Sequence, residues 1–437
     1  MSTGAGTSGA VDGELPTDGE LPLDGEPPLV AAARDGDTDL VRRLLLEGGD
    51  PDVCDARGTP VFWLAVEARS ATVAQLLLDH GADAGRCGPD GPHPLRAAVD
   101  RGSPALVEVL LDSRVRARYS EQELLEMRDL ARHWYETGVE AELRRRTGAG
   151  GSAGRVRVQD DEFNSVHELS LGGTTVRDGH AAILTRLEEL LRIRAGFEEL
   201  MGRALAHRDP DHTAWGSAAI LLAHRRDEET WTAAAALRAH PDPVRRLFGA
   251  EVLRLTHLFD DSDEDVFAGP ALDMFTDWSA EEADLAVLTE VLVALGEHPG
   301  PRAEAALLPH AGHRDARVRR AVAQGLSAWS SPPVFSGAAR AALRELMTDK
   351  EAVVREDACL TVAVGRDRDP ALADALAALL DDADRRVRAV AVYGLALHDD
   401  ERCVEGARRL GPPRPDRPDE ERYLGAAWRY EWRRDGR

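Results

Sequence analysis

Histidines are the residues of this 437-residue chain whose type and spacing come nearest to a metal site. The closest pairs are His207 with His212 and His310 with His313. A protein zinc site takes three or four ligands, and no third ligand stands at zinc-like spacing beside either pair. We therefore expect surface or turn histidines, and the sequence predicts no metal ligands.

Two glycine-rich motifs overlap in one segment. Gly150–Gly154 matches the G-x-S-x-G pattern of serine hydrolases, and Gly148–Ala153 matches a dinucleotide-binding fingerprint. Both motifs need a strand before them and a helix after them to position the nucleophile or the pyrophosphate. Here an arginine-rich helix end precedes and an extended segment follows, so both matches are interpreted as accidents of composition.

An acidic run resembles a calcium loop through Asp261, Asp263 and Asp265. It lacks the glycine and the glutamate that such a loop needs, because Val266 and Leu272 stand at those places. The four cysteines are too few and too scattered for a disulfide framework or a C-x-x-C metal knuckle. The sequence thus predicts no catalytic residue, no cofactor and no metal.

Charge and composition exclude further classes. Acidic residues outnumber basic ones by 78 to 54, which gives a net charge of -24. This balance disfavours non-specific binding to nucleic acid or to an anionic membrane, because phosphate neutralisation needs a surplus of positive charge. Lys350 is the only lysine and no glycine-rich loop precedes it, so a phosphate-binding P-loop is absent. The bias toward arginine indicates a GC-rich bacterial genome.

Targeting signals are not evident. The first residues contain no basic and apolar leader, and no run of about 18 apolar residues predicts a membrane span. We expect a cytoplasmic location. Residues 1–23 carry acidic Pro/Gly hexads, which favour a disordered leader.

A repeat of 33 residues follows. The positions that keep one register across three copies are Gly25, Gly58 and Gly91; Leu29, Phe62 and Leu95; Ala32, Ala65 and Ala98; Leu40, Val73 and Leu106; Leu44, Leu77 and Leu110; and Leu45, Leu78 and Leu111. One such unit cannot bury its apolar face alone, so the copies must stack.

This segment resembles the ankyrin repeat family over about residues 24–115. The carrying stretches are 24–32, 58–65 and 90–98, followed by endings such as 73–83. The ankyrin family has Thr and His at two positions of each such stretch. In the three copies here, these two positions hold Pro27 and Val30, Pro60 and Trp63, and His93 and Arg96. Gly36 and Gly102 occupy the first-helix end, where φ > 0 is useful, but Arg69 stands in the middle copy and predicts strain or rearrangement.

The rest of the chain is predicted to be mostly helical. The ankyrin domain with its helical cap, which is broken near Gly138, spans 24–146. A linker and β-ribbon split by Gly172-Gly173 span 147–178, and a second helical array spans 179–410. A Pro-rich linker and an amphipathic helix occupy 411–437. That helix carries Leu424, Trp428 and Trp432 one turn apart, and it either caps the array or docks a partner.

The second array repeats an acidic start followed by Val-Arg and a small-residue face, and it predicts helix pairs such as 318–326 with 338–346 and 387–395 with 404–410. It resembles HEAT-like repeats of the phycobilin-lyase type over about 180–410. The resemblance implies that the arginine pairs with an acidic residue of a neighbouring unit, which makes the following residues structural: Arg245, Arg319, Arg355 and Arg388.

The fold class is therefore mostly α, with two α-solenoids and a small β-ribbon between them. We expect a non-enzymatic scaffold that binds another protein through repeat turns and a concave solenoid face, and the acidic charge favours a partner with a basic surface. The candidate binding residues are Arg57, Trp63, Arg86, Asp90, His93, Trp428 and Trp432. The alternatives are a HEAT-like lyase acting on a bilin-type chromophore and a HEAT-like DNA glycosylase, which the net charge disfavours.

Overall fold

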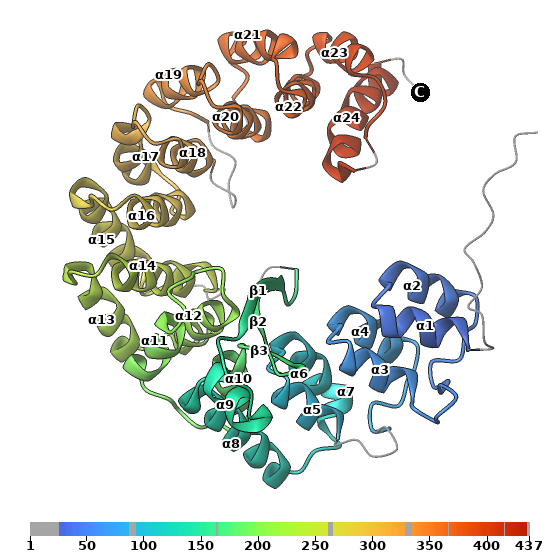
Figure 1. Cartoon of the computed structure of the whole chain (residues 1–437). Coiled ribbons are helices and arrows are strands. Elements are labelled where there is room, and N and C mark those ends of the chain that lie inside the picture. The colour runs from blue at the N-terminus through green and yellow to red at the C-terminus, as the bar shows by residue number, and fades with distance from the viewer. Residues whose placement is uncertain are drawn as a thin grey trace, which may run out of the picture. The chain divides into compact units, whose positions relative to one another are not determined.

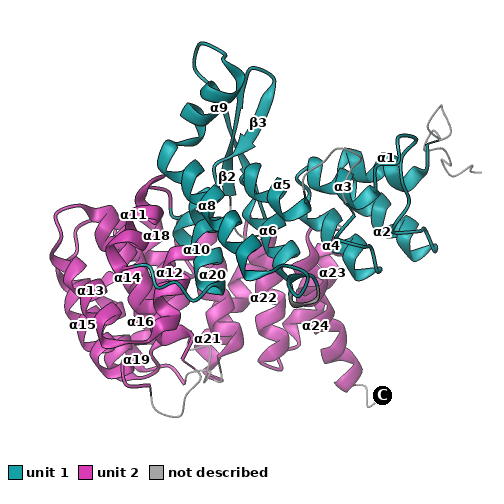
Figure 2. Ribbon diagram, turned by 90° about the horizontal axis from the view of Figure 1, so that it is seen from below, with its two compact units in different colours: residues 1–195, 210–216 teal, residues 196–209, 217–437 magenta. Residues whose placement is uncertain are grey.

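The computed structural model describes residues 26–86, 93–162, 165–260, 265–327, 334–365, 367–414 and 416–434. These divide into two compact units, shown in different colours in Figure 2. Unit 1 comprises residues 1–195 and 210–216, and unit 2 comprises 196–209 and 217–437. The expected boundary at residue 178 differs from this division, because helix α10 (His180–Leu190) belongs to unit 1. The acidic leader and Asp90 lie outside the described residues.

Three helix pairs open unit 1, one pair in each 33-residue repeat (Figure 1). They are α1 (Pro28–Asp35) with α2 (Thr38–Leu46), α3 (Val61–Glu67) with α4 (Ala71–Asp79), and α5 (Pro94–Asp100) with α6 (Pro104–Leu111). Side-chain caps start two of the second helices: Asp37 accepts a hydrogen bond from Leu40 N at 3.0 Å, and Ser70 accepts one from Val73 N at 3.3 Å. Leucines in the aligned slots are buried in one continuous core or, for Leu40, Leu44 and Leu78, half-buried against it.

The turn between paired helices has a left-handed backbone in all three repeats. Gly36 has φ 72°, Arg69 has φ 57° and Gly102 has φ 66°. Of the two alternatives expected for Arg69, the structure shows the strained left-handed conformation, and the turn is not rearranged. Its Nε lies 3.1 Å from Glu168 Oε2, and its carbonyl accepts a hydrogen bond from Arg177 Nη1 at 3.2 Å. These contacts offset part of the cost of a non-glycine residue at φ > 0.

Unit 1 continues with helices and a small sheet. The helices are α7 (Ser113–Arg116), α8 (Glu121–Thr137) and α9 (Val139–Thr147). Gly138, at φ 82°, separates α8 from α9, as the sequence predicts. The strands are β1 (Gly154–Gln159), β2 (Ser165–Leu171) and β3 (Thr174–Arg177), in the antiparallel order β1-β2-β3.

The sheet covers a small core of its own. Leu169 and Val176 are paired in register across β2 and β3, and they pack with Trp134 and Leu143 from α8 and α9. The turn between β2 and β3 is Gly172-Gly173, both at positive φ (58° and 80°), which confirms the predicted hairpin. Residues 148–153 form a loop that leads into β1, so the G-x-S-x-G match lacks the strand–turn–helix that its chemistry needs.

Unit 2 consists of helices and short 3-10 turns. The helices are α11 (Phe197–Leu205), α12 (Thr213–Arg225, whose first residues belong to unit 1), α13 (Glu228–Ala236), α14 (Pro243–Leu258), α15 (Ala268–Glu281), α16 (Leu285–Glu297), α17 (Pro301–Leu307), α18 (Ala316–Gly325), α19 (Gly337–Leu346), α20 (Ala352–Val364), α21 (Pro370–Ala378), α22 (Arg385–Leu397), α23 (Arg402–Leu410) and α24 (Pro418–Arg434). From α13 to α23, even-numbered helices form one layer and odd-numbered helices the other (Figure 1). The 3-10 turns, at 237–239, 308–310 and 379–381, precede α14, α18 and α22.

Small residues let neighbouring even-numbered helices approach closely. A Cβ added to Gly296 of α16 would lie 2.4 Å from Gly325 Cα of α18. Between α18 and α20, Thr361 Oγ1 donates a hydrogen bond to Ala323 O at 2.8 Å. The small-residue face recognised in the sequence is therefore the packing surface of this layer.

Three arginines of this layer form what we call the arginine ladder. Each guanidinium donates two hydrogen bonds to a carboxylate that lies later in the chain. A further N–H of the same guanidinium donates to one or two carbonyl oxygens of the loop before its own helix. The pairs are Arg246 with Glu282, Arg319 with Asp349, and Arg355 with Asp382, at 2.6–2.9 Å. The structural role predicted for Arg319 and Arg355 agrees with these contacts. Arg388 instead donates to the carbonyls of Asp382 and Ala383, at 2.5 and 3.0 Å.

Arg245, which the sequence pattern places in this set, does not belong to it. The ladder position is the fourth residue after the N-cap, and in α14 that residue is Arg246, four after Asp242. Arg245 is rotated by about 100° around the helix axis. It points instead toward Glu198, with 3.9 Å between Nη1 and Oε2. The assignment was wrong because Val244 is one residue nearer to its cap than Val318 is to Asp315.

Among the described residues, no helix combines the length and the apolar character that crossing a membrane would require.

Candidate functional site

Arg57 is the turn residue of unit 1 that the structure leaves exposed. Asp55 fixes its turn, because one carboxylate oxygen accepts hydrogen bonds from the N–H groups of Arg57 and Thr59, both at 2.8 Å. The hydrogen bond from the Thr59 N–H is the main reason why the pKa of Asp55 lies below its usual value. A rigid turn that presents an arginine at little entropic cost is suited to binding a partner.

Arg86 and His93 have contacts within the repeat stack. Arg86 Nη1 donates to Asp52 O at 2.6 Å, and its Nη2 lies 3.1 Å from Cys54 Sγ. It thereby braces the preceding turn. The His93 ring lies edge-on to Tyr119, with 4.9 Å between ring centroids, and burial lowers its pKa. Both side chains are half-buried, so they stabilise the turns in addition to any contact with a partner.

Trp63 is not on the surface where the sequence analysis placed it. Trp63 is 4% exposed, and it belongs to the same core as the aligned leucines. Every residue of α3 from Val61 to Val66 is buried, because this middle helix packs against both α1 and α5. Trp63 is therefore a core residue, and we remove it from the candidate binding set.

Trp428 and Trp432 on α24 form the most prominent exposed aromatic surface in the described part of the chain, and we call it the tryptophan pair. The two residues are 65% and 50% exposed, and their rings are stacked with 6.3 Å between centroids. Other residues of α24 are buried, among them Tyr423, Leu424 and Tyr430. The helix packs on α22 and α23, so it does fold back onto the array.

The arginines around the tryptophan pair are partly neutralised. Arg433 pairs with Asp399 at 3.3 Å, and Arg434 pairs with Glu401 at 2.7 Å. The aromatic rings are therefore the part of this surface whose exposed groups are not engaged in ion pairs. Truncation of exposed Trp residues of this kind accounts for much of the binding energy at protein interfaces.

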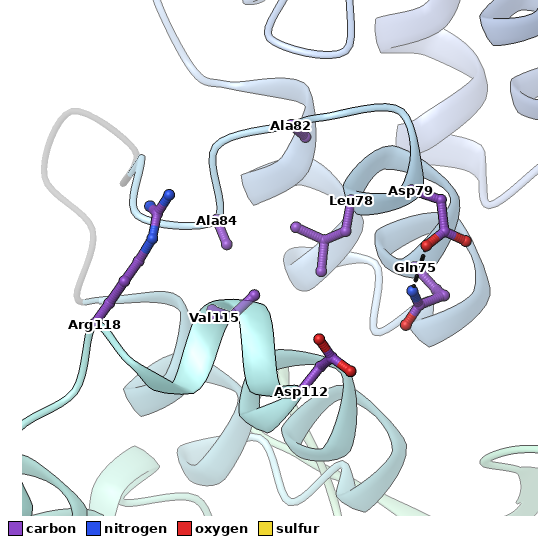
Figure 3. Close-up of a pocket in the computed structure, with 8 residues that line it drawn as sticks. All are labelled: Gln75, Leu78, Asp79, Ala82, Ala84, Asp112, Val115 and Arg118. Atoms are coloured by element: carbon purple, nitrogen blue, oxygen red, sulfur yellow. Dashed lines mark hydrogen bonds between the residues drawn. The ribbon is translucent and has the colours of Figure 1, made fainter.

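A small cavity lies between α4 and the segment around α7 in unit 1. Its volume is about 210 Å³, and it has an apolar floor and a charged rim (Figure 3). The lining residues are Gln75, Leu78, Asp79, Ala82, Ala84, Asp112, Val115 and Arg118. Small-molecule pockets usually measure roughly 300–1,000 Å³. This cavity suits a single side chain of a partner better than a metabolite.

A larger cavity, of about 600 Å³, lies in unit 2 beside α13 and α15. Its charged groups are paired: Arg238 with Glu281 at 2.7 Å, and Arg246 with Glu282 at 2.8 Å. Trp278 Nε1 also donates to Glu282 Oε2, at 2.9 Å. Because these charges hold the fold together, the cavity offers no evident acid–base pair.

The expectation of surface histidines is wrong for the most buried ones. His180, His212 and His298 are 1%, 0% and 6% exposed. Sequence spacing could not reveal this, because their surroundings come from helices and strands distant in the chain. His313 does lie in a turn, where its Nδ1 accepts a hydrogen bond from Asp315 N at 3.1 Å. In the acidic run, Asp261 and Asp263 lie outside the described residues, while Asp265 contacts His257 at 2.5 Å.

Burial of His298 predicts a pH-dependent stability. The ring stacks on His257, with 4.0 Å between centroids, and burial together with the charge of His257 lowers the pKa of His298 to about 4, against the opposing effect of Asp265. The unfolded chain therefore binds a proton there between pH ~6.5 and ~4, while the folded chain does not. Stability from this group is complete above pH ~6.5 and falls by up to about 3 kcal/mol as the pH drops through that window.

The variant His298→Phe keeps a stacked ring but cannot be protonated. Its free energy of unfolding, measured by urea denaturation, is expected to decline less steeply between pH ~6.5 and ~4 than that of the wild type. Parallel pH profiles for the two proteins would contradict the assignment.

Comparison with known proteins identifies part of unit 1. A family model described as ankyrin repeats (3 copies) matches residues 29–121, so the resemblance seen in the sequence is confirmed there. The X-ray structure of the Escherichia coli protein YibA is similar at 16% sequence identity and a TM-score of 0.40, covering 54% of this chain and 92% of that one. Likeness at this level carries no argument. No curated protein matches the sequence.

Proposed function

We propose that this protein is a non-enzymatic, cytoplasmic scaffold that binds another protein. Its ankyrin repeats suggest a role in protein–protein interaction. The observation that carries the proposal is the tryptophan pair, because two stacked, exposed indoles cost solvation free energy unless a partner covers them. In this proposal the helix array of unit 2 is HEAT-like, and α24 both caps it and presents the pair.

The partner is proposed to have a basic surface. The chain's net charge is -24, and many of its acidic residues stand at helix starts and turns, where they stay near solvent. Opposite charge on a partner would accelerate association and make binding weaker at higher salt. Arg57, on its rigid turn, would add a local contact within unit 1.

The experiment is a pull-down from a native extract with three baits. Wild type should recover one protein in stoichiometric amount, and the double variant Trp428→Ala/Trp432→Ala should lose it by at least about 10-fold, since Trp residues are enriched among hot spots. Leu46→Ala is the matched control, because Leu46 is an equally exposed apolar residue (73%) in unit 1. It should bind as the wild type does. Equal recovery by the double variant, or retention of only a small molecule, would reject the proposal.

No observation among the described residues specifically supports either alternative function. A bilin lyase requires a chromophore pocket with positioned catalytic groups, and the larger of the two cavities described above has its charged groups paired. Absorbance of the purified protein with and without added bilin tests this alternative. A glycosylase requires a basic groove with aromatic residues, and a DNA gel shift at low salt tests that one.

A further inference from the structure

Two histidines and an aspartate of unit 1 converge from three separate segments. His167 is on β2, Asp178 follows β3, and His212 lies in the segment 210–216. Asp178 Oδ2 is 3.2 Å from His167 Nδ1, and Asp178 Oδ1 is 3.0 Å from His212 Nε2. The three donor atoms all lie within 4.8 Å of one another.

Backbone contacts hold these side chains in place. Asp178 Oδ1 accepts a hydrogen bond from His167 N at 2.7 Å, and Asp178 N donates to His167 O at 3.0 Å. The chain on either side of His212 is also fixed, since Ser165 N donates to Asp211 O at 3.1 Å. Supporting contacts of this kind orient the ligands of metal sites and keep the geometry rigid.

The burial of the group is unusual for residues that only stabilise a fold. His212 is fully buried, the Asp178 side chain is 5% exposed, and the His167 side chain is 22% exposed. Two imidazoles and a carboxylate gathered in a largely buried place form a donor set that a divalent cation can bind. The partial exposure of His167 provides a route to solvent.

We propose that His167, Asp178 and His212 bind a transition-metal ion of the Zn²⁺ class. In a tetrahedral zinc site, ligand atoms about 2.0–2.2 Å from the metal lie roughly 3.3–3.5 Å from each other. The two Asp178–histidine separations, 3.2 and 3.0 Å, are close to this spacing. Two imidazoles and one carboxylate are a ligand set that Zn²⁺ takes, whereas Mg²⁺ and Ca²⁺ prefer oxygen ligands alone.

Metal binding requires one rearrangement in the protein. His212 Nδ1 accepts a hydrogen bond from Ala214 N at 3.2 Å, which places the ring proton on Nε2. Coordination through Nε2 moves that proton to Nδ1, which gives up this bond and also the hydrogen bond between Nε2 and Asp178 Oδ1. Nitrogen-preferring metals gain enough from ligation to offset such a loss, and protonation of the imidazoles at low pH should weaken binding.

The site is tested by calorimetric titration of the full-length, untagged chain with Zn²⁺ after dialysis against a chelator. The wild type should bind one Zn²⁺ per chain with a Kd below about 1 μM, and Asp178→Asn and His167→Ala should each bind at least about 100-fold more weakly. The matched control is the double variant His310→Ala/His313→Ala, which removes the other close histidine pair of the sequence and should bind as the wild type does.

A second measurement separates ligand loss from misfolding. Co²⁺ added to the wild type should give the intense visible absorption of a four-coordinate ion, saturating at one equivalent and disappearing when Zn²⁺ is added. Zn²⁺ should also raise the Tm of the wild type and not that of His167→Ala. A wild type that binds no Zn²⁺, or ligand variants that bind Zn²⁺ as tightly as the wild type does, would overturn the proposal.

Discussion

Replacing Arg319 by alanine is expected to lower the free energy of unfolding by about 3–5 kcal/mol, the typical cost of breaking a buried ion pair from one side. The Arg319 side chain is 8% exposed. It donates two hydrogen bonds to Asp349, at 2.6 and 2.8 Å, and two more to the carbonyls of His313 and Arg314, at 2.8 and 3.1 Å. The variant leaves these acceptors without their donor in a water-poor interior.

The same contacts control the charge of Asp349. Burial alone would raise the pKa of this carboxyl, but the hydrogen bonds from Arg319 hold it below its usual value. A carboxyl group whose pKa is lowered by folding stabilises the folded chain at pH values above its unfolded-state pKa. That stability is lost as the pH falls through the folded-state pKa. Removing Arg319 raises the pKa of Asp349, so the deficit of the variant should be largest near neutral pH and smaller in acid.

Arg317→Ala is the matched control, because Arg317 is in the same helix and also pairs with an aspartate. Its side chain is 64% exposed, and it contacts Asp315 at 3.0 Å. Water screens this pair, so the variant should lose far less stability than Arg319→Ala. Urea unfolding curves of the three proteins give the comparison. Similar losses for the two variants would show that the arginine ladder does not brace unit 2.

Replacing Gly102 by alanine is expected to cost unit 1 about 2–4 kcal/mol, for two reasons that add. The residue has φ 66°, a conformation that alanine adopts at a cost of about 1 kcal/mol. An added Cβ would also lie 2.0 Å from Arg177 O and 2.6 Å from His180 Cε1. Arg177 O belongs to backbone held by the hydrogen bond from Arg177 N to Arg101 O at 2.9 Å, so it cannot easily move.

Gly36→Ala separates the two causes. Gly36 occupies the same slot two repeats earlier and has φ 72°, but nothing lies within 4 Å of its added Cβ. Its replacement should cost only the conformational part, about 1 kcal/mol. Thermal and urea denaturation of both variants measure the difference. Equal costs would mean that the contact between Gly102 and the end of β3 is not as tight as the structure shows.

Much of the local structure could be predicted from the sequence. The 33-residue period located the helix pairs of the ankyrin repeats, since the apolar slots recur with the helix face that must be buried. Gly138 and Gly172-Gly173 marked a helix break and a hairpin because each requires a positive φ. In unit 2 the small-residue faces and aspartate caps predicted α18 and α22 close to their observed bounds.

The candidate residues were harder to assign. Exposure of an aromatic residue depends on what packs over it, and the apolar run from Val61 to Val66 around Trp63 was the sequence signal for burial, whereas Trp428 is followed by charged residues. Trp63 is buried because α3 lies between two other repeats, whereas Trp428 is exposed because α24 has a neighbour on one face only. Arg245 was misplaced for a related reason: a shift of one residue rotates a side chain by about 100° on a helix, and the sequence motif tolerated that shift.

What the sequence determined by itself is the periodic part: two arrays of helices, their turns and a strongly acidic charge, because these follow from short-range spacing and composition. Only the tertiary structure decided which groups meet across large separations in the chain. His167, Asp178 and His212 come together from three segments, and Gly102 contacts the end of β3 some 75 residues later. Spacing along the chain cannot encode such contacts, because they depend on how the packed elements bring remote side chains to within a few ångströms.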